Sequence, residues 1–259
     1  MWKKEPFRPP FPDPSQIEAI DDPTLPELET APEPDPIVEA LPLLALVIAV
    51  LALSLFTFIA DSVIHDQTMA MDLSVRSWVH QLATPLRTDA MLTLSFIGGT
   101  GLVFISVLTV LALWHWRWRR ASVRLTVTLV GALVLDLALK WGFHRPRPVP
   151  FYGPVPPTYS FPSGHALFSL CFYGVLAGLV AGRMPRIWLR GAVWAGAVLL
   201  IAGVGVSRIY LGVHYPSDVI AGFLAAALWV SAMVAFDRLR ARRSSRQQQE
   251  SRPAASQKP

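Results

Sequence analysis

The chain has 259 residues, of which 53% are hydrophobic and only 16% are charged, and its formal net charge is +5. That balance excludes an ordinary soluble domain with a charged surface and fits a protein whose solvent is partly lipid. Cys171 is the only cysteine, which excludes an intramolecular disulfide and a cysteine-based metal site.

The N-terminal segment, residues 1–40, holds ten prolines and ten acidic residues. Such a segment cannot bury enough apolar surface to offset the entropy lost on ordering, so we predict that it is a disordered tail. We expect no signal peptide before the first apolar run, which begins at Leu41. We therefore expect that run to be a retained membrane span.

Six stretches are long and apolar enough to cross a bilayer, which takes about 20 residues each. They predict an all-α fold, a polytopic membrane protein with a six-transmembrane-helix bundle in residues 41–237, followed by a basic disordered tail in 238–259. A helical core buried in a large soluble protein is disfavoured, because six such runs leave too little polar surface. The predicted spans are Leu41–Ala60, Thr93–Trp114, Leu125–Phe143, His165–Gly182, Gly191–Ile209 and Asp218–Phe236.

A further short helix is predicted between the first two spans. It could lie in the membrane interface or pack on the bundle, and the sequence allows both. The apolar residues that recur there at helical spacing are Met71, Val75, Trp78, Val79 and Leu82.

Arginine-rich connections set the expected topology. Residues 117–124 and 183–190, together with the basic C-terminal tail, are typical of cytoplasmic segments, so both termini are predicted to be cytoplasmic. Basic residues beside a membrane span more often reflect the orientation of the chain in the membrane, or contact with anionic lipid, than nucleic-acid binding. We expect a multi-pass protein of the cell (inner) membrane, with membrane lipids and no nucleic acid as partners. The connections expected to face outward are 61–92, 144–164 and 210–217.

The first polar cluster is the sequence KWGFHRPRP. Lys140 lies in the last turns of the third predicted span, and Arg147 lies in the loop just beyond. Two cations held this way suit the oxygens of a phosphate, and arginine offers a two-pronged donor. Alternatively, Lys140 extends to the membrane surface and Arg147 caps a helix. Asp136 can form an intrahelical ion pair with Lys140, which we interpret as structural.

The second cluster is the sequence FPSGHA, at the start of the fourth predicted span. A helix N-terminus offers free backbone N–H groups and a partial positive charge, which together bind anions. Gly164 lets the backbone approach an anion, Ser163 adds a hydroxyl donor, and His165 can transfer a proton near neutral pH. The alternative is that Ser163 is only a helix cap and His165 an interfacial histidine.

The third cluster is the sequence SRIYLGVHYPSD. Arg208 ends the fifth predicted span, His214 lies in a short loop, and Asp218 begins the sixth span. A carboxylate four residues after a histidine can accept a hydrogen bond from one ring nitrogen and leave the other free to attack. Three unrelated interfacial polar groups are the alternative interpretation.

Together the clusters resemble the signature motifs of the type 2 phosphatidic acid phosphatase superfamily. Every motif position is filled, the order along the chain agrees, and the resemblance covers about residues 90–236. The motifs read Lys140-x6-Arg147-Pro148, Pro162-Ser163-Gly164-His165 and Ser207-Arg208-x5-His214-x3-Asp218.

This resemblance implies an active site at the outer membrane–water interface, facing the periplasm or exterior, and a reaction that needs no metal or other cofactor. His214 would be the nucleophile, Asp218 its orienting partner, and His165 the acid that protonates the leaving oxygen and then the base for water. The residues that would bind phosphate are Lys140, Arg147, Ser163, Gly164 and Arg208.

The implied function is a lipid phosphate phosphatase that acts on a phosphomonoester or pyrophosphate through a phosphohistidine. Undecaprenyl pyrophosphate, phosphatidylglycerol phosphate and phosphatidic acid all qualify as substrates, with a slight preference for the polyprenyl pyrophosphate. The alternative is a lipid phosphotransferase that uses the same phosphoenzyme. A non-catalytic membrane protein or transporter is disfavoured by the intact His165, His214 and Asp218.

Overall fold

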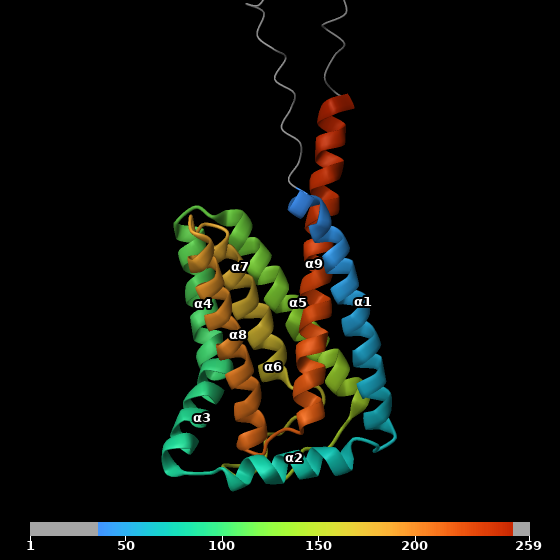
Figure 1. The fold of residues 1–259 in the computed structure, drawn as a ribbon, viewed down its shortest axis with the longest axis vertical. Coiled ribbons are helices and arrows are strands. Elements are labelled where there is room, and N and C mark those ends of the chain that lie inside the picture. Colours follow the sequence, from blue (N-terminus) through green and yellow to red (C-terminus); the bar gives the residue numbers. More distant parts are fainter. Residues whose placement is uncertain (1–35, 251–259) are drawn as a thin grey trace, which may run out of the picture. The chain divides into compact units, whose positions relative to one another are not determined.

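The computed structural model describes residues 36–250, and every regular element in that range is a helix (Figure 1). This confirms the all-α prediction. Most of the predicted N-terminal tail, residues 1–35, and residues 251–259 of the predicted C-terminal tail lie outside the described range. The last part of the predicted N-terminal tail, residues 36–40, is instead the start of α1. The elements are α1 (Pro36–Ile64), α2 (Met69–Gln81), α3 (Pro85–Gly98), α4 (Thr100–His115), α5 (Arg119–Phe143), α6 (Gly164–Ser169), the π-helical turn η2 (Leu170–Gly174), α7 (Val175–Ala181), α8 (Ile187–Tyr210) and α9 (Pro216–Glu250).

Five helical segments of the described chain are long and apolar enough to cross a membrane. They are α1, α5, the continuous run α6–η2–α7, α8 and α9. The helices α3 and α4 meet at an angle of 42° and make a sixth span if the bent pair is counted as one. The multi-span prediction is confirmed, and the difference from six straight helices lies in that bend.

Close packing explains the glycines at the bend. A Cβ atom added to Gly98 would lie 2.2 Å from Cγ1 of Val204 on α8. One added to Gly99 would lie 2.4 Å from Nε2 of His165 on α6. Only glycine permits both contacts, so the junction of α3 and α4 is held against the two helices that contribute to the polar end of the bundle.

Apolar side chains fill the interior and also cover much of the outer surface. Leu125 and Phe172 are fully buried in one cluster between α4, α5 and the π-helical turn. On outward faces, Leu51, Leu108 and Leu199 remain 64%, 66% and 73% exposed. Large apolar surfaces of this kind are costly in water but not in hydrocarbon, which agrees with a bundle surrounded by lipid.

The short helix α2 lies across one end of the bundle (Figure 1), so the predicted helix is present. Its inward face is polar. Asp72 and Arg76 are buried, and the ring of His80 stacks on Phe151 with 3.8 Å between ring centroids. The most exposed of its predicted apolar residues are Met71, Trp78 and Leu82. α2 therefore packs on the protein through a polar stripe and through Val79, which contacts the apolar cluster of Tyr210, Leu211 and Val213, and it leaves other apolar side chains outside.

The C-terminal basic segment differs from the prediction. Residues 238–250 continue α9 to Glu250, whereas the sequence analysis assigned them to a disordered tail. The segment is rich in Arg and Gln and contains neither Gly nor Pro, so intrinsic propensity extends the helix beyond its apolar part.

Candidate active site

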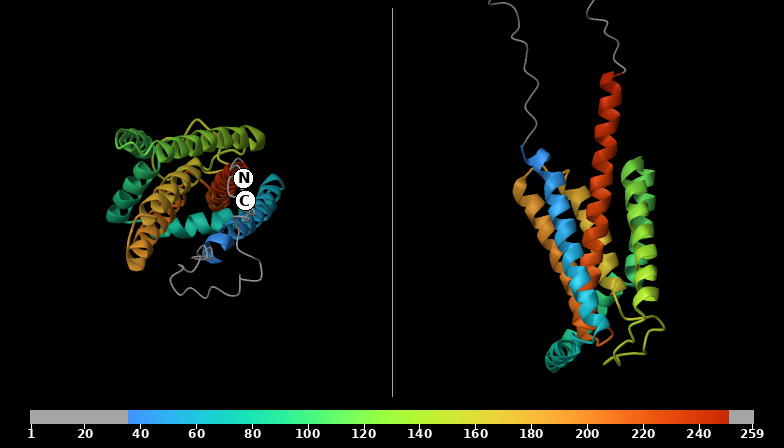
Figure 2. Two further views of the ribbon diagram at one scale, coloured as in Figure 1. Left: turned by 90° about the horizontal axis from the view of Figure 1, so that it is seen from above. Right: turned by 90° about the vertical axis from the view of Figure 1, so that its right-hand side faces the viewer.

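The site lies at the end of the bundle where α5 and α8 end and α6 and α9 begin. The two connections that complete it, residues 144–163 and 211–215, lie at the same end as α2 (Figures 1 and 2). The arginine-rich connections 117–124 and 183–190 lie at the opposite end. The three sequence clusters therefore meet because the helices that carry them end or begin at one level.

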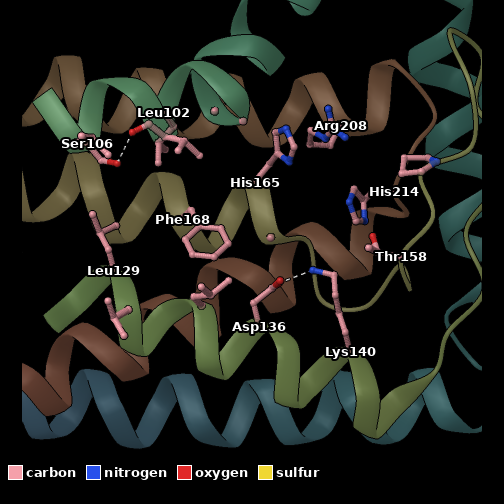
Figure 3. Close-up of a pocket in the computed structure, with 18 of the residues that line it drawn as sticks. Leu102, Ser106, Leu129, Asp136, Lys140, Thr158, His165, Phe168, Arg208 and His214 are labelled. Atoms are coloured by element: carbon pink, nitrogen blue, oxygen red, sulfur yellow. Dashed lines mark hydrogen bonds and ion pairs between the residues drawn. The ribbon is translucent and has the colours of Figure 1, made fainter. Parts of the chain in front are cut away.

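A cavity of about 860 Å³ opens there. Its polar end is lined by six of the eight predicted site residues, and Figure 3 shows His165, Arg208 and His214 lying opposite Lys140. From this end the cavity continues as a groove between α4 and α5. The six polar residues are Lys140, Arg147, Gly164, His165, Arg208 and His214; apolar residues in the groove include Leu102, Val107, Leu129, Val130 and Leu133.

The other two predicted residues, Ser163 and Asp218, are fully buried and do not line the cavity. The backbone N–H of Ser163 donates to the backbone carbonyl of Asp218 at 2.9 Å, which joins the start of α6 to the start of α9. The buried Oγ of Ser163 has no hydrogen-bond partner in the described protein. Asp218 lies behind His214.

His214 and Asp218 form the expected pair. Nδ1 of His214 lies 3.4 Å from Oδ2 of Asp218, and the other ring nitrogen, Nε2, lies 2.9 Å from Nη1 of Arg147. Because an arginine can only donate, we assign the lone pair to Nε2 and the proton to Nδ1. The same Oδ2 of Asp218 also accepts from Ser160 Oγ at 2.5 Å and from the backbone N–H of Tyr215 at 2.9 Å.

The environment of His214 favours its neutral form. Burial lowers the pKa of His214 to about 4; Asp218 opposes this shift, and the cations of Arg147 and Arg208 add to it. A neutral imidazole with a lone pair on its cavity-side nitrogen is the form that can attack an electrophile.

Arg147 is fixed by the loops around it. Its Nε donates to the carbonyl of Thr158 at 2.6 Å and its Nη2 to Oγ1 of the same residue at 2.8 Å. Nη1 also donates to the carbonyl of Val213 at 2.9 Å. Burial is the largest influence and lowers the pKa of Arg147. The guanidinium therefore faces the cavity in a set orientation beside Nε2 of His214.

Lys140 is paired with Asp136 as the sequence spacing predicts, with 2.5 Å between Nζ and Oδ1. A Cβ added to Gly164 would lie 3.0 Å from that Oδ1 and 3.2 Å from Nζ. Glycine thus lets the first turn of α6 approach the ion pair, and the helix N-terminus and the ammonium group face the same space.

Arg208 and His165 complete the polar end. Arg208 donates from Nη1 to Oγ of Ser95 on α3, and its buried Nε has no partner in the described protein. His165 lies against Gly99. Three cations and a helix N-terminus thus surround the space in front of His214, an arrangement suited to an anion with several oxygens. Within residues 36–250, no three His, Cys, Asp or Glu side chains gather closely enough to hold a metal ion.

The sequence analysis missed several residues that build this site. Arg145 donates to both Asp72 and Asp218, Ser217 donates to Asp72, and Ser160 donates to Asp218. Arg145 stands inside the first cluster, two positions before Arg147, and its charge beside a span end was an available signal. The contact of Asp72 with Ser217 joins residues 145 positions apart, and nothing in the local sequence marks it.

Comparison with known sequences adds three findings. Residues 121–242 match the family model described as the PAP2 superfamily. An undecaprenyl-diphosphatase from Sulfolobus acidocaldarius is 36% identical over 140 residues, which cover 51% of this chain and 62% of that protein. A phosphatidylglycerophosphatase B from Bacillus subtilis is 26% identical over 192 residues, covering 72% of this chain and 93% of the relative.

One solved structure shares the fold. It is a transmembrane PAP2 type phosphatidylglycerolphosphate phosphatase from Bacillus subtilis, with a TM-score of 0.67 and 24% sequence identity. The superposition covers 73% of this chain and 96% of that one.

The neutrality of His214 can be measured directly. Histidine-labelled protein in detergent micelles, studied by NMR, should show the His214 ring titrating with a midpoint near pH 4, because burial disfavours the charged form. The resonance is assigned by its loss in His214→Gln. The pKa of His214 is lower in the folded protein than in the unfolded chain. The free energy of unfolding should therefore decrease as the pH falls from about 6.5 to about 4, because the unfolded chain binds this proton first. A midpoint near 6.5 would contradict this account.

Proposed function

We propose that the chain is a membrane phosphatase of the PAP2 superfamily, whose family model matches residues 121–242, and that it hydrolyses a lipid phosphomonoester or pyrophosphate through a phosphohistidine on His214. One observation carries the proposal. A single cavity joins a neutral histidine, surrounded by Lys140, Arg147 and Arg208, to an apolar groove along the membrane-spanning helices. An anionic head and a hydrocarbon tail would each meet a matching environment there.

In the proposed first step, Nε2 of His214 attacks the phosphorus and the bond to the leaving oxygen breaks. Arg147 Nη1, which now donates to Nε2, shifts its hydrogen bond to a phosphoryl oxygen and so releases the lone pair. Lys140 and Arg208 bind the remaining oxygens, where charge is distributed in the transition state. The ring becomes cationic as it attacks, and the carboxylate of Asp218 stabilises that charge through Nδ1–H.

In the same proposal, His165 supplies the proton to the leaving oxygen. It then accepts a proton from the water that hydrolyses the phosphohistidine, so the two steps use the same group in opposite directions. Its place on the first turn of α6, against Gly99 and on the cavity wall, supports this role.

The groove supports a lipid as substrate. Thr126 and Lys140 both line the cavity and lie fourteen residues apart on α5, about 21 Å at 1.5 Å per residue. The hydroxyls of Ser106 and Thr126 donate to carbonyls of their own helices, so they leave the groove apolar. Among the candidate lipids we put a polyprenyl pyrophosphate first, since the relative at 36% identity is an undecaprenyl-diphosphatase.

We also propose that the site faces the outside of the membrane, because the arginine-rich connections lie at the other end. A cysteine replacing the exposed Val155 should react with an impermeant thiol reagent in intact cells, whereas one replacing the exposed Ile187 should react only after lysis. Cys171 is fully buried and should stay silent in both variants. Labelling of Val155→Cys only after lysis would reverse the topology.

The role of the groove is tested by filling it. Val107 lines the groove and is 53% exposed, so Val107→Trp should fold and obstruct the tail of the substrate. We expect kcat/KM for undecaprenyl pyrophosphate to fall at least about tenfold and that for nitrophenyl phosphate to change less than about twofold, since only interactions with the tail are lost. An assay of phosphate release measures kcat/KM for both substrates.

The matched control is Leu108→Trp, on the same helix but outside the groove and 66% exposed, which should leave both substrates unaffected. Equal losses for both substrates in Val107→Trp would show that the groove does not bind a lipid tail. Absence of phosphate release from every lipid in the wild type would overturn the proposed function itself.

A further inference from the structure

The side of Asp218 that faces away from His214 is bound by Arg145. Nη1 of Arg145 donates to Oδ1 of Asp218 at 2.6 Å and to Oγ of Ser217 at 2.8 Å. The guanidinium is buried and lies 4.3 Å from the centre of the Tyr215 ring. Arg145 does not line the cavity, so it contacts the site only through Asp218 and its neighbours.

The other arm of Arg145 reaches α2. Nη2 donates to Oδ2 of Asp72 at 2.8 Å. Asp72 is fully buried, and it also accepts from the backbone N–H of Ser217 at 2.9 Å and from Oγ of Ser217 at 2.6 Å. One guanidinium is thus shared by two buried carboxylates. Burial alone would lower the pKa of Arg145, but Asp218 and Asp72 raise it above its ordinary value.

A second contact holds α2 over the site. Arg76, one turn after Asp72, donates from Nη2 to the backbone carbonyls of Val149 and Gly212, the latter at 3.2 Å. These carbonyls belong to the two connections that carry Arg147 and His214. α2 therefore contacts both loops of the site and, through Arg145, its buried carboxylate.

We infer that Arg145 and Asp72 are positioning residues that fix the carboxylate of Asp218 in the orientation needed by His214. The inference rests on the proposed function. A buried ion pair is weak evidence for stability, because apolar residues of similar size often stabilise a fold as well or better. Here two carboxylates share one cation, which leaves a buried negative charge beside the ring that becomes cationic during attack. Arginine suits this role because its planar fork can hold two acceptors at once, whereas lysine is a point charge.

The test is a double-mutant cycle between Arg145 and Asp218. Arg145→Lys keeps the charge but loses the fork, and we expect kcat to fall about 10- to 100-fold with KM changed less than about threefold. In an Asp218→Asn background the same substitution should change the rate less than about twofold, because the group it positions is already lost. Single-turnover phosphoryl transfer from labelled undecaprenyl pyrophosphate, with enzyme in excess, measures all four proteins.

The matched control is Arg124→Lys, in the ion pair that Arg124 makes with Asp237 at 3.3 Å, which should leave the rate unchanged. If Arg145→Lys does not fold, Asp72→Asn replaces it, since the amide keeps the shape of Asp72. Asp72→Asn should lower kcat at least about threefold. In the Asp218→Asn background, it should change the rate less than about twofold.

Rate losses that multiply in the double variants, or a change confined to KM, would overturn the inference while leaving the proposed function intact. A wild-type protein that transfers no phosphoryl group would overturn both.

Discussion

A carboxylate that is fully buried in a largely apolar bundle must be compensated, and the arrangement of this site follows from how Asp218 is compensated. Its two oxygens accept from Arg145, Ser160 and the backbone N–H of Tyr215, and Oδ2 lies beside Nδ1 of His214. These donors come from the loop after α5, the segment before α6 and the turn before α9. An uncompensated charge there would cost several kcal/mol, so the three segments cannot move independently without a large penalty.

The lining of the cavity changes from cationic to apolar along its length. At its polar end, cations and a helix N-terminus favour a phosphate, while burial keeps the His214 ring neutral and able to attack. A few residues further along α4 and α5 the lining becomes apolar, and the hydroxyls present are bonded to their own helices. The structure therefore separates a cationic end from an apolar groove by position along the bundle, which is what the proposed amphiphilic substrate requires.

The sequence predicted the features that depend on local pattern. Apolar runs marked the spans, and the four-residue spacings Asp136–Lys140, within α5, and His214–Asp218, across the start of α9, correctly predicted neighbouring side chains. It did not reveal Asp72 or Ser160, because their partners lie 145 and 58 residues away and are set by packing. The inward polar stripe of α2 was also missed, since the helical period was read from apolar residues, of which Met71, Trp78 and Leu82 are exposed. The close contact between Gly99 and His165 could not be predicted either, because it depends on how α6 packs against the junction of α3 and α4.

The central claim is that phosphate passes through Nε2 of His214, and trapping the intermediate tests it most directly. In His165→Ala, which lacks the proposed base for water, transfer from nitrophenyl phosphate should survive better than transfer from a lipid, because nitrophenolate leaves without a proton donor. Rapid quenching with labelled phosphate should then give an acid-labile, base-stable label that mass spectrometry places on His214. The account would be contradicted by a label on another residue, or by turnover that persists without a label when His214 is replaced by alanine.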